Sequence, residues 1–145
     1  MAVPEPNIAR LLGAVVDVME AELHRRLEAA GFADIRPSHF AVFRHIDSEG
    51  SRLTDLAARA QMTKQSIGEL VTALEERGYL ERRPDPDDGR VKLITLTRRG
   101  QESRATAFRA FREIEAHWGE RLGRRRVDEL RATLAGIAGL EPAPG

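Results

Sequence analysis

The spacing of apolar residues in this chain changes from about 3.6 to 2 at Gly78, and this change limits the folds available to it. After Gly78, the segments 79–83 and 91–97 alternate as β-strands do. The nonapeptide RRPDPDDGR, residues 82–90, holds six charges and two prolines, so it is predicted to be an exposed loop. The pattern predicts a β-hairpin with a charged tip. Its inward-facing residues are predicted to be Leu80, Ile94 and Leu96.

Two helices are predicted ahead of this region, from apolar residues that recur three and four positions apart. The first is amphipathic and ends near Gly31. Its apolar residues are Ile8, Leu11, Leu12, Val15, Met19, Leu23 and Leu27. The second should begin around Pro37 and stop at Gly50, because proline suits the first turn of a helix and glycine suits its end. Its apolar residues are Phe40, Phe43 and Ile46.

Two shorter helices with polar caps follow directly. Thr54 is the predicted N-cap of one of them, which should bury Leu56, Ala57 and Ala60. Thr63 is the predicted N-cap of the next, which runs to Arg77 and is closed by Gly78. The buried stripe of that helix is predicted to be Ile67, Leu70, Val71 and Leu74. Two capped helices joined by a tight turn and followed by a hairpin are typical of a winged helix-turn-helix.

Two more helices follow, so the predicted fold is mainly α with a small β-hairpin wing. Thr97 can cap a long helix, whose apolar side carries Phe108, Phe111, Trp118 and Leu122. The apolar residues of the last helix are Val127, Leu130, Leu134 and Ile137. The run Arg124 to Arg126 is expected to solvate the turn between these two helices. Residues 141–145 are expected to be a frayed tail.

Composition excludes several kinds of chemistry. The chain has no cysteine, so thiol catalysis, disulfides and cysteine-ligated zinc are impossible. It has no glycine-rich phosphate loop, no G-x-S-x-G and no H-E-x-x-H, so neither an enzyme nor a bound cofactor is expected. His39 and His45 lie on opposite sides of a helix, and no metal site is expected there. DPDDG does not fit an EF-hand, because Gly89 is fifth and Leu96 is twelfth from Asp85.

Charge and hydropathy indicate where the protein acts. The formal net charge is zero, which argues against indiscriminate binding to nucleic acid or to anionic membranes. Residues 51–100 nevertheless carry ten basic and eight acidic side chains, so the middle of the chain is modestly basic. The sequence begins without a signal-peptide pattern, and no apolar run approaches the ~20 residues that span a bilayer. A cytoplasmic, nucleoid-associated protein is expected.

The polar side of the 63–77 helix is the predicted DNA-reading surface. With the apolar stripe toward the core, the residues that point the other way are Gln65, Glu69, Thr72 and Glu76. Short polar side chains in the first turns, with free N–H groups and the positive end of the helix dipole, suit base edges and phosphates. The predicted contacts are Thr63, Lys64, Gln65, Ser66, Gly68 and Glu69, and Gly68 should allow close approach. The alternative interpretation is an ordinary solvated helix face.

The charged hairpin favours DNA contact over a merely solvated face. Arg90 near its tip can enter a minor groove, and phosphates are within reach of Arg82, Arg83 and Lys92. Asp88 is predicted to hold the Arg90 guanidinium in one orientation. Asp85 is predicted to form a turn through its side chain.

A family resemblance covers nearly the whole chain. Residues 52–100, RLTDLAARAQMTKQSIGELVTALEERGYLERRPDPDDGRVKLITLTRRG, resemble the DNA-binding lobe of the MarR (multiple antibiotic resistance regulator) family. The most specific parts are LEERGYLERR, the wing DPDDGR and the closing LTRRG, and the flanking helices fit in number and order. The resemblance implies one domain over 1–145, with a winged helix-turn-helix lobe at 36–100 and dimerisation helices at 5–31 and 101–140.

The resemblance also implies site residues and a function. The recognition helix is Thr63 to Arg77 and the wing arginine is Arg90. Relatives often carry a basic residue at the position of Glu69, so their base preference does not carry over, and an acceptor there would favour a cytosine amino group. The implied protein is a sequence-specific DNA-binding regulator, a repressor, that acts as a homodimer on a pseudo-palindromic operator. A small apolar or phenolic effector would release it, and His39 and Phe43 are the guesses for its pocket.

Two other functions remain open from the sequence. The winged helix could serve as a protein-interaction module, or the chain could be a small-molecule carrier that does not bind DNA. The salt dependence of binding distinguishes these functions from DNA binding. The affinity for DNA falls steeply with added salt, and the other two functions predict no such dependence.

Overall fold

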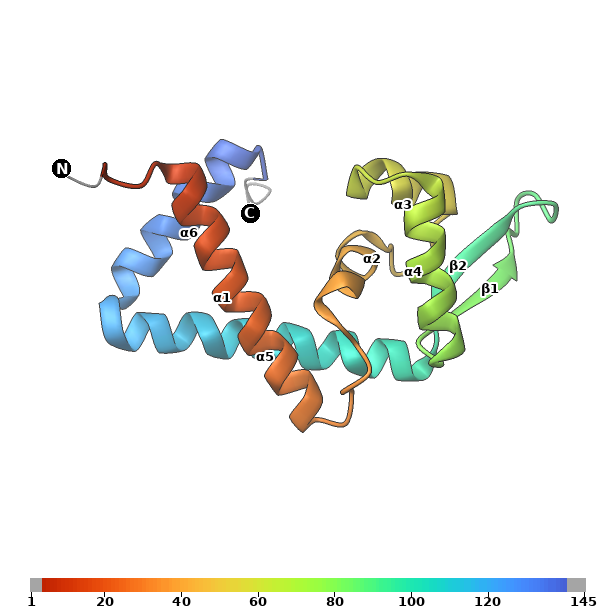
Figure 1. Ribbon diagram of the computed structural model, residues 1–145, viewed down its shortest axis with the longest axis horizontal. Coiled ribbons are helices and arrows are strands. Elements are labelled where there is room, and N and C mark those ends of the chain that lie inside the picture. The colour runs from red at the N-terminus through yellow and green to blue at the C-terminus, as the bar shows by residue number, and fades with distance from the viewer. Residues whose placement is uncertain (1–3, 141–145) are drawn as a thin grey trace. The chain divides into compact units, whose positions relative to one another are not determined.

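The computed structural model describes residues 4–140 and consists of helices and one two-stranded antiparallel sheet (Figure 1). The predicted fold class, mainly α with a β-hairpin wing, is confirmed. Cα packing divides the chain into two compact units between Ala107 and Phe108. The expected frayed tail at 141–145 lies outside the described residues. The elements are α1 (Ile8–Ala29), η1 (Pro37–His39), α2 (Phe40–His45), α3 (Leu53–Ala60), α4 (Lys64–Glu76), β1 (Leu80–Pro84), β2 (Lys92–Leu96), α5 (Arg98–Leu122) and α6 (Arg124–Ala138).

Two predicted N-caps and one predicted C-terminal glycine are present. The Thr63 hydroxyl accepts a hydrogen bond from the Ser66 N–H at 3.0 Å, so α4 begins where the sequence indicates. Gly78 follows α4 with φ of +81°, the left-handed conformation that ends a helix most cheaply when the residue is glycine. The Thr97 hydroxyl accepts from the Gly100 N–H at 3.1 Å and so caps α5.

Two helix boundaries were predicted wrongly. The second helix begins as a short 3-10 turn and ends at His45, well before Gly50, because Ile46 is extended with ψ of 129°. The carbonyl of His45 accepts from Arg59 at 2.9 Å, so a side chain distant in sequence satisfies this helix end. The N-cap of α3 is Arg52 and makes no side-chain cap bond, whereas Thr54 lies inside the helix.

The core of the first unit lies beneath α3, α4 and the hairpin. Its most completely buried side chains, each at most 1% exposed, are Ile35, Val42, Leu56, Ile67, Val71, Leu74, Tyr79 and Ile94. The predicted stripe of α4 is confirmed for Ile67, Val71 and Leu74, while Leu70 is half-buried. The stripe of α1 is covered only at its C-terminal end, where Leu23 and Leu27 are buried.

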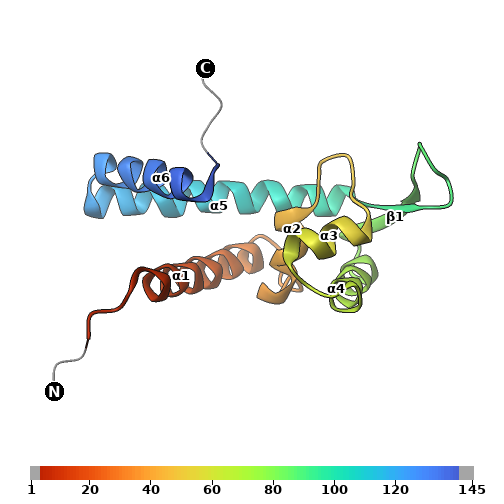
Figure 2. The ribbon, with the colours of Figure 1, turned by 90° about the horizontal axis from the view of Figure 1, so that it is seen from above.

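The hairpin matches the predicted strands to within one residue at each end and has an additional partner. Leu80 pairs with Leu96 and Pro84 with Lys92, so β1 extends one residue beyond its predicted end, to Pro84. The three predicted inward residues of the hairpin are buried. Ser51, just before α3, exchanges two backbone hydrogen bonds of 2.9 Å with Ile94. This bridge ties β2 to the start of α3. The hairpin tip projects beyond α4 in both views (Figures 1 and 2).

The second unit comprises the C-terminal part of α5 and all of α6. Gly123, with φ of +102°, turns the chain between the two helices. Arg131 of α6 donates to Glu115 of α5 and joins them. The run Arg124 to Arg126 was predicted to occupy the turn, but it forms the exposed first turn of α6 instead.

Candidate nucleic-acid interface

The outward side of α4 is polar, as its sequence predicts. Its buried stripe faces the core, and exposed positions on the helix and its cap are Thr63, Lys64, Gln65, Ser66, Glu69, Thr72 and Glu76. The Thr63 hydroxyl accepts a hydrogen bond from the Ser66 N–H in the first turn. The N–H groups of Lys64 and Gln65 have no acceptor within the helix, because no helical carbonyl lies four residues before them. The N-terminal half of α4 therefore offers hydrogen-bonding side chains and backbone donors at one exposed site.

The face of α4 and the first strand of the wing line one shallow groove. Its walls are formed by Lys64, Gln65, Gly68, Glu69, Thr72, Ala73, Glu76 and Arg82. Arg82 comes from β1, and its Nε donates to Glu75 of α4 at 2.8 Å. The structure thus brings Arg82 beside the recognition-helix candidates, but with its charge already paired. A Cβ added to Gly68 would meet Leu53 at 3.8 Å, so this glycine borders α3.

The wing residues were predicted to be exposed cations, and all four of them are, namely Arg82, Arg83, Arg90 and Lys92. Arg83 pairs with Glu81, two residues before it, at 2.6 Å. The Arg90 side chain is 92% exposed, and its Nε donates to Asp88 at 3.2 Å. Asp88 also accepts from the Arg90 backbone N–H at 3.1 Å. The predicted contact that orients Arg90 is therefore present.

Asp85 is buried and anchors the wing, a role that the sequence did not reveal. Its Oδ1 accepts from the Asp87 N–H at 2.9 Å, which makes the predicted side-chain turn. Its Oδ2 accepts from Nη2 and Nε of Arg52 at 2.7 and 3.1 Å. These contacts, first the Asp87 N–H and then Arg52, lower the pKa of Asp85. Because Arg52 is the N-cap residue of α3, the pair fixes the start of the wing loop to the helix-turn-helix.

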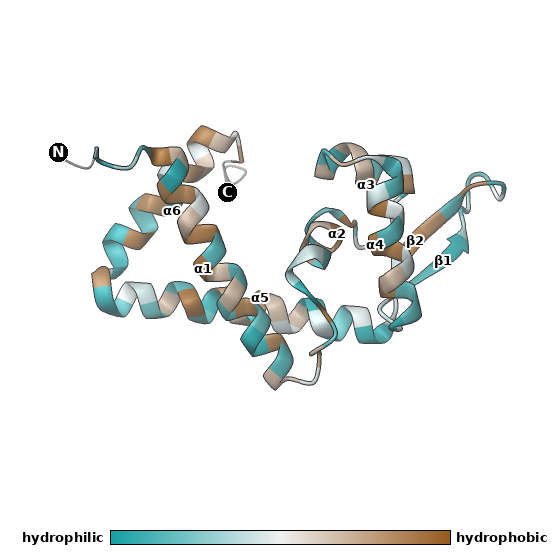
Figure 3. Ribbon diagram, in the orientation of Figure 1, coloured by the Kyte–Doolittle hydropathy of each residue, from teal (hydrophilic) through white to brown (hydrophobic). Residues whose placement is uncertain are grey.

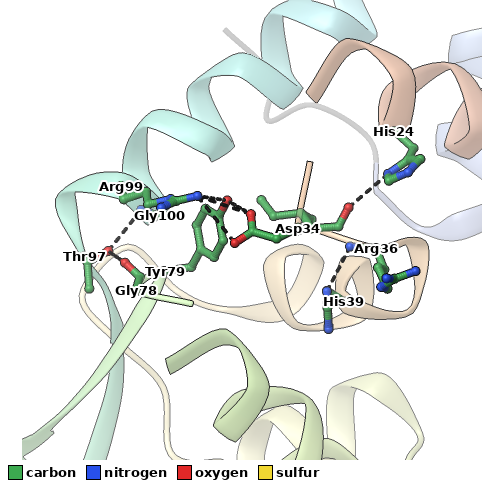
Figure 4. Close-up of polar contacts among 10 residues, drawn as sticks. His24, Asp34, Arg36, His39, Gly78, Tyr79, Thr97, Arg99 and Gly100 are labelled. Carbon is green, nitrogen blue, oxygen red and sulfur yellow. Dashed lines mark hydrogen bonds and ion pairs between the residues drawn. The ribbon is translucent and has the colours of Figure 1, made fainter. Parts of the chain in front are cut away.

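A second polar cluster sits at the end of α4 and centres on Tyr79 (Figure 4). The Tyr79 hydroxyl donates to Asp34 and accepts from Arg99 at 2.9 Å. The Arg99 guanidinium also lies 4.6 Å from the centroid of the tyrosine ring, and Phe43 meets that ring edge-on. Burial, followed by the bond to Asp34, raises the pKa of Tyr79. The cluster joins the linker after α1, the end of α4 and the first turn of α5.

His39, one of the two guesses for a ligand pocket, is packed into the lobe. It is 4% exposed, and its Nδ1 accepts from the Arg36 N–H at 2.9 Å. Its Nε2 lies 3.0 Å from Nη1 of Arg77. Burial lowers the pKa of His39, and the charges of Arg77 and Arg36 lower it further against the opposing effect of Asp34. The neutral imidazole is therefore the form that suits the folded state.

This pKa shift predicts a loss of stability in mild acid. The unfolded chain binds the proton more readily than the folded chain. The free energy of unfolding should therefore have its full value above about pH 6.5 and should decrease as the pH falls below it. Urea denaturation at several pH values between about 5.5 and 7.5 measures this slope. In His39→Asn the slope should be shallower, with the remainder coming from His45, whose pKa burial also lowers. Equal slopes in the two proteins would contradict the assignment.

Within residues 4–140, no three His, Asp or Glu side chains are grouped so that they could hold a metal ion. Over the same residues, no helix is both long enough and apolar enough to cross a membrane.

Known proteins share this sequence pattern and fold. A family model described as "MarR family" matches residues 33–91. Transcriptional regulator HosA of Escherichia coli O111:H- is 33% identical over 76 residues, which cover 52% of this chain and 56% of HosA. The match thus spans little more than half of that relative's length.

Two solved structures resemble the whole chain. CouR of Rhodococcus jostii RHA1, solved with bound p-coumaroyl-CoA, is 27% identical with a TM-score of 0.70, covering 99% of this chain and 100% of CouR. MepR of S. aureus, solved as a DNA complex, is 22% identical with a TM-score of 0.68, covering 93% of this chain and 98% of MepR. The likeness to MepR shows a common fold and nothing more.

Proposed function

The chain belongs to the MarR family of winged helix-turn-helix transcription regulators, and from that membership we propose that it binds specific DNA sequences and represses transcription. The observation that carries the proposal is the groove that α4 shares with Arg82 of the wing. The lobe at 36–100 sets α4 in a major groove, where its N-terminal half meets base edges, and the wing reaches the adjacent minor groove. The proposed DNA contacts are Thr63, Lys64, Gln65, Ser66, Gly68, Glu69, Arg82, Arg83, Asp88, Arg90 and Lys92.

The DNA-binding unit is a homodimer formed by the helices within 5–31 and 101–140. Exposed apolar side chains in each of the two units support this, because a monomeric protein rarely exposes large contiguous apolar patches. Figure 3 shows apolar residues recurring along α1 and along α6. On α1 they are Ile8, Leu11, Leu12, Val15, Val16 and Val18, and beyond Ala107 they are Phe108, Leu122, Leu130, Ile137 and Leu140. A twofold dimer presents two copies of α4 and therefore reads a pseudo-palindromic operator.

A small effector of the phenolic class releases the protein from DNA. CouR supports this class, since it was solved with p-coumaroyl-CoA, a thioester of a phenolic acid. Release requires that the effector bind the DNA-free geometry more tightly than the DNA-bound one, because a ligand shifts an equilibrium only through differential affinity. Operator affinity measured with increasing p-coumaroyl-CoA or related phenolic acids should fall. If none of them changes operator affinity, this effector class is wrong.

The central test is a selection of bound sequences from random DNA, followed by binding measurements at several salt concentrations. A specific regulator should enrich one pseudo-palindromic motif. Its affinity should fall with salt at a log–log slope of about −0.9 per neutralised phosphate. A protein-interaction module or a small-molecule carrier would enrich no motif, and that outcome would refute the proposed function.

Replacing Arg90 with alanine should weaken operator binding by about 1–3 kcal/mol, because the substitution removes a groove contact that Asp88 holds in place. Arg125→Ala is the matched control. Arg125 is also 92% exposed and paired with a carboxylate, but it lies on α6 outside the lobe, so its loss should leave affinity unchanged. Fluorescence anisotropy with labelled operator measures both. Equal affinities of the two variants would argue against a wing contact.

A further inference from the structure

The helix proposed to enter the major groove is acidic, which is unexpected beside a polyanion. Helix α4 contains one lysine and three glutamates. Arg82 neutralises Glu75 at 2.8 Å, whereas Glu69 and Glu76 remain exposed and line the groove. Each of these two carboxylates is repelled by phosphates when the helix approaches DNA of any sequence. A carboxylate that costs affinity on every sequence adds specificity only where one sequence offers it a hydrogen-bond donor.

Glu69 lies where such a contact can form. It is on the second turn of α4, one turn after Gln65, and the N-terminal residues of a recognition helix are those that meet base edges. The Gln65 amide nitrogen lies 3.5 Å from Oε1 of Glu69, so the two side chains are neighbours on one exposed face. Glu76 lies almost two turns further along the same face, at the C-terminal end of the helix.

The chemistry of a carboxylate restricts what Glu69 can read. An ionised carboxylate only accepts hydrogen bonds. In the major groove the bases that donate are cytosine through N4 and adenine through N6, and adenine is matched better by an amide that bonds N6 and N7 together. We propose that Glu69 is a specificity-determining residue that accepts a hydrogen bond from the N4 amino group of one cytosine in each operator half-site. This inference rests on the proposed function.

Three proteins and two forms of the selected operator test the inference. The full-length wild type, Glu69→Gln and Glu76→Gln are each used to select from a random DNA library. Both variants remove one negative charge from the same helix face, so Glu76→Gln controls for the general loss of repulsion. The wild-type operator is then made with N4-methylcytosine at the assigned position, which keeps the base pair but replaces the hydrogen that faces the major groove.

The wild type should select cytosine at one position of each half-site, and N4-methylation there should weaken binding about 5- to 150-fold. Glu69→Gln should lose the cytosine, favour adenine and be indifferent to the methyl group. Glu76→Gln should select the wild-type motif and bind all sequences more tightly.

Two outcomes would overturn the inference, and they are distinguishable. If Glu69→Gln selects the wild-type motif, or if methylation leaves wild-type binding unchanged, Glu69 does not read a cytosine, although the proposed function stands. If the wild type enriches no motif at all, the proposed function fails together with the inference.

Discussion

Replacing Gly100 with alanine is expected to lower the free energy of unfolding by about 1–3 kcal/mol. Gly100 lies in the first turn of α5, and a Cβ built there would fall 2.2 Å from the Tyr79 carbonyl oxygen and 3.1 Å from Leu96. That carbonyl cannot easily retreat, because it accepts the Thr97 N–H at 3.0 Å. The methyl group would therefore push α5 away from Tyr79 and from the end of β2. Urea denaturation at fixed protein concentration measures the loss.

The same substitution at Gly68 should have the opposite sign and is the natural control. A Cβ at Gly68 would meet only Leu53, at 3.8 Å, which is ordinary van der Waals contact. Alanine is a better helix former than glycine by roughly 1 kcal/mol, so Gly68→Ala should stabilise the protein. If Gly68 allows close approach to DNA, that stable variant should bind the operator more weakly. Unchanged or raised stability of Gly100→Ala would contradict the packing described for Gly100, and destabilisation by Gly68→Ala would contradict the open space described at Gly68.

The largest effect on assembly is expected from the double substitution Leu11→Glu and Val15→Glu. These side chains are 49% and 42% exposed on α1 and lie one turn apart. Each fully buried aliphatic side chain contributes roughly 1.5–3 kcal/mol, and a twofold interface counts every residue twice. The dimer dissociation constant should therefore rise about a hundredfold or more, and operator affinity should fall with it. Analytical ultracentrifugation and operator binding measure the two effects.

A variant with the same change in charge separates loss of the interface from added repulsion. Ala14→Glu with Ala21→Glu also adds two carboxylates to exposed positions of α1, but these positions lie away from its apolar stripe. This variant should remain dimeric and bind the operator with nearly wild-type affinity. A wild-type protein that is monomeric at micromolar concentration would refute the proposed dimer outright.

Local signals predicted much of the fold. The bounds of α4 follow from Thr63 and Gly78. Each of these two residues acts only on backbone groups a few positions away, the hydroxyl as an N-cap and the glycine through its left-handed conformation. The hairpin follows from the alternation of apolar residues on either side of the charged nonapeptide. The contact between Asp88 and Arg90 was also predictable, since the two residues are close neighbours in the chain.

Contacts between residues far apart in sequence could not be predicted in this way. Asp85 was expected in an exposed loop, yet Arg52, 33 positions earlier, makes its burial possible. The early end of α2 depends in the same way on Arg59, whose guanidinium satisfies the carbonyl of His45. The pairing of Arg82 with Glu75 depends on how β1 lies against α4, which the sequence pattern does not indicate. The spacing of residues in the sequence does not indicate which carboxylate or carbonyl a long arginine side chain will reach. Only the folded backbone identifies the pair.

The Tyr79 cluster joins α4, the proposed recognition helix, to the chain segments at both ends of the lobe. Tyr79 is the second residue after the cap of α4, and its ring and hydroxyl are held by Asp34 ahead of the lobe and by Arg99 at the start of α5. Tilting α4 relative to the first turn of α5 would have to break the bonds of Tyr79 to Asp34 and Arg99. The cluster therefore resists independent movement of these two helix ends, and with it any independent movement of the proposed recognition helix.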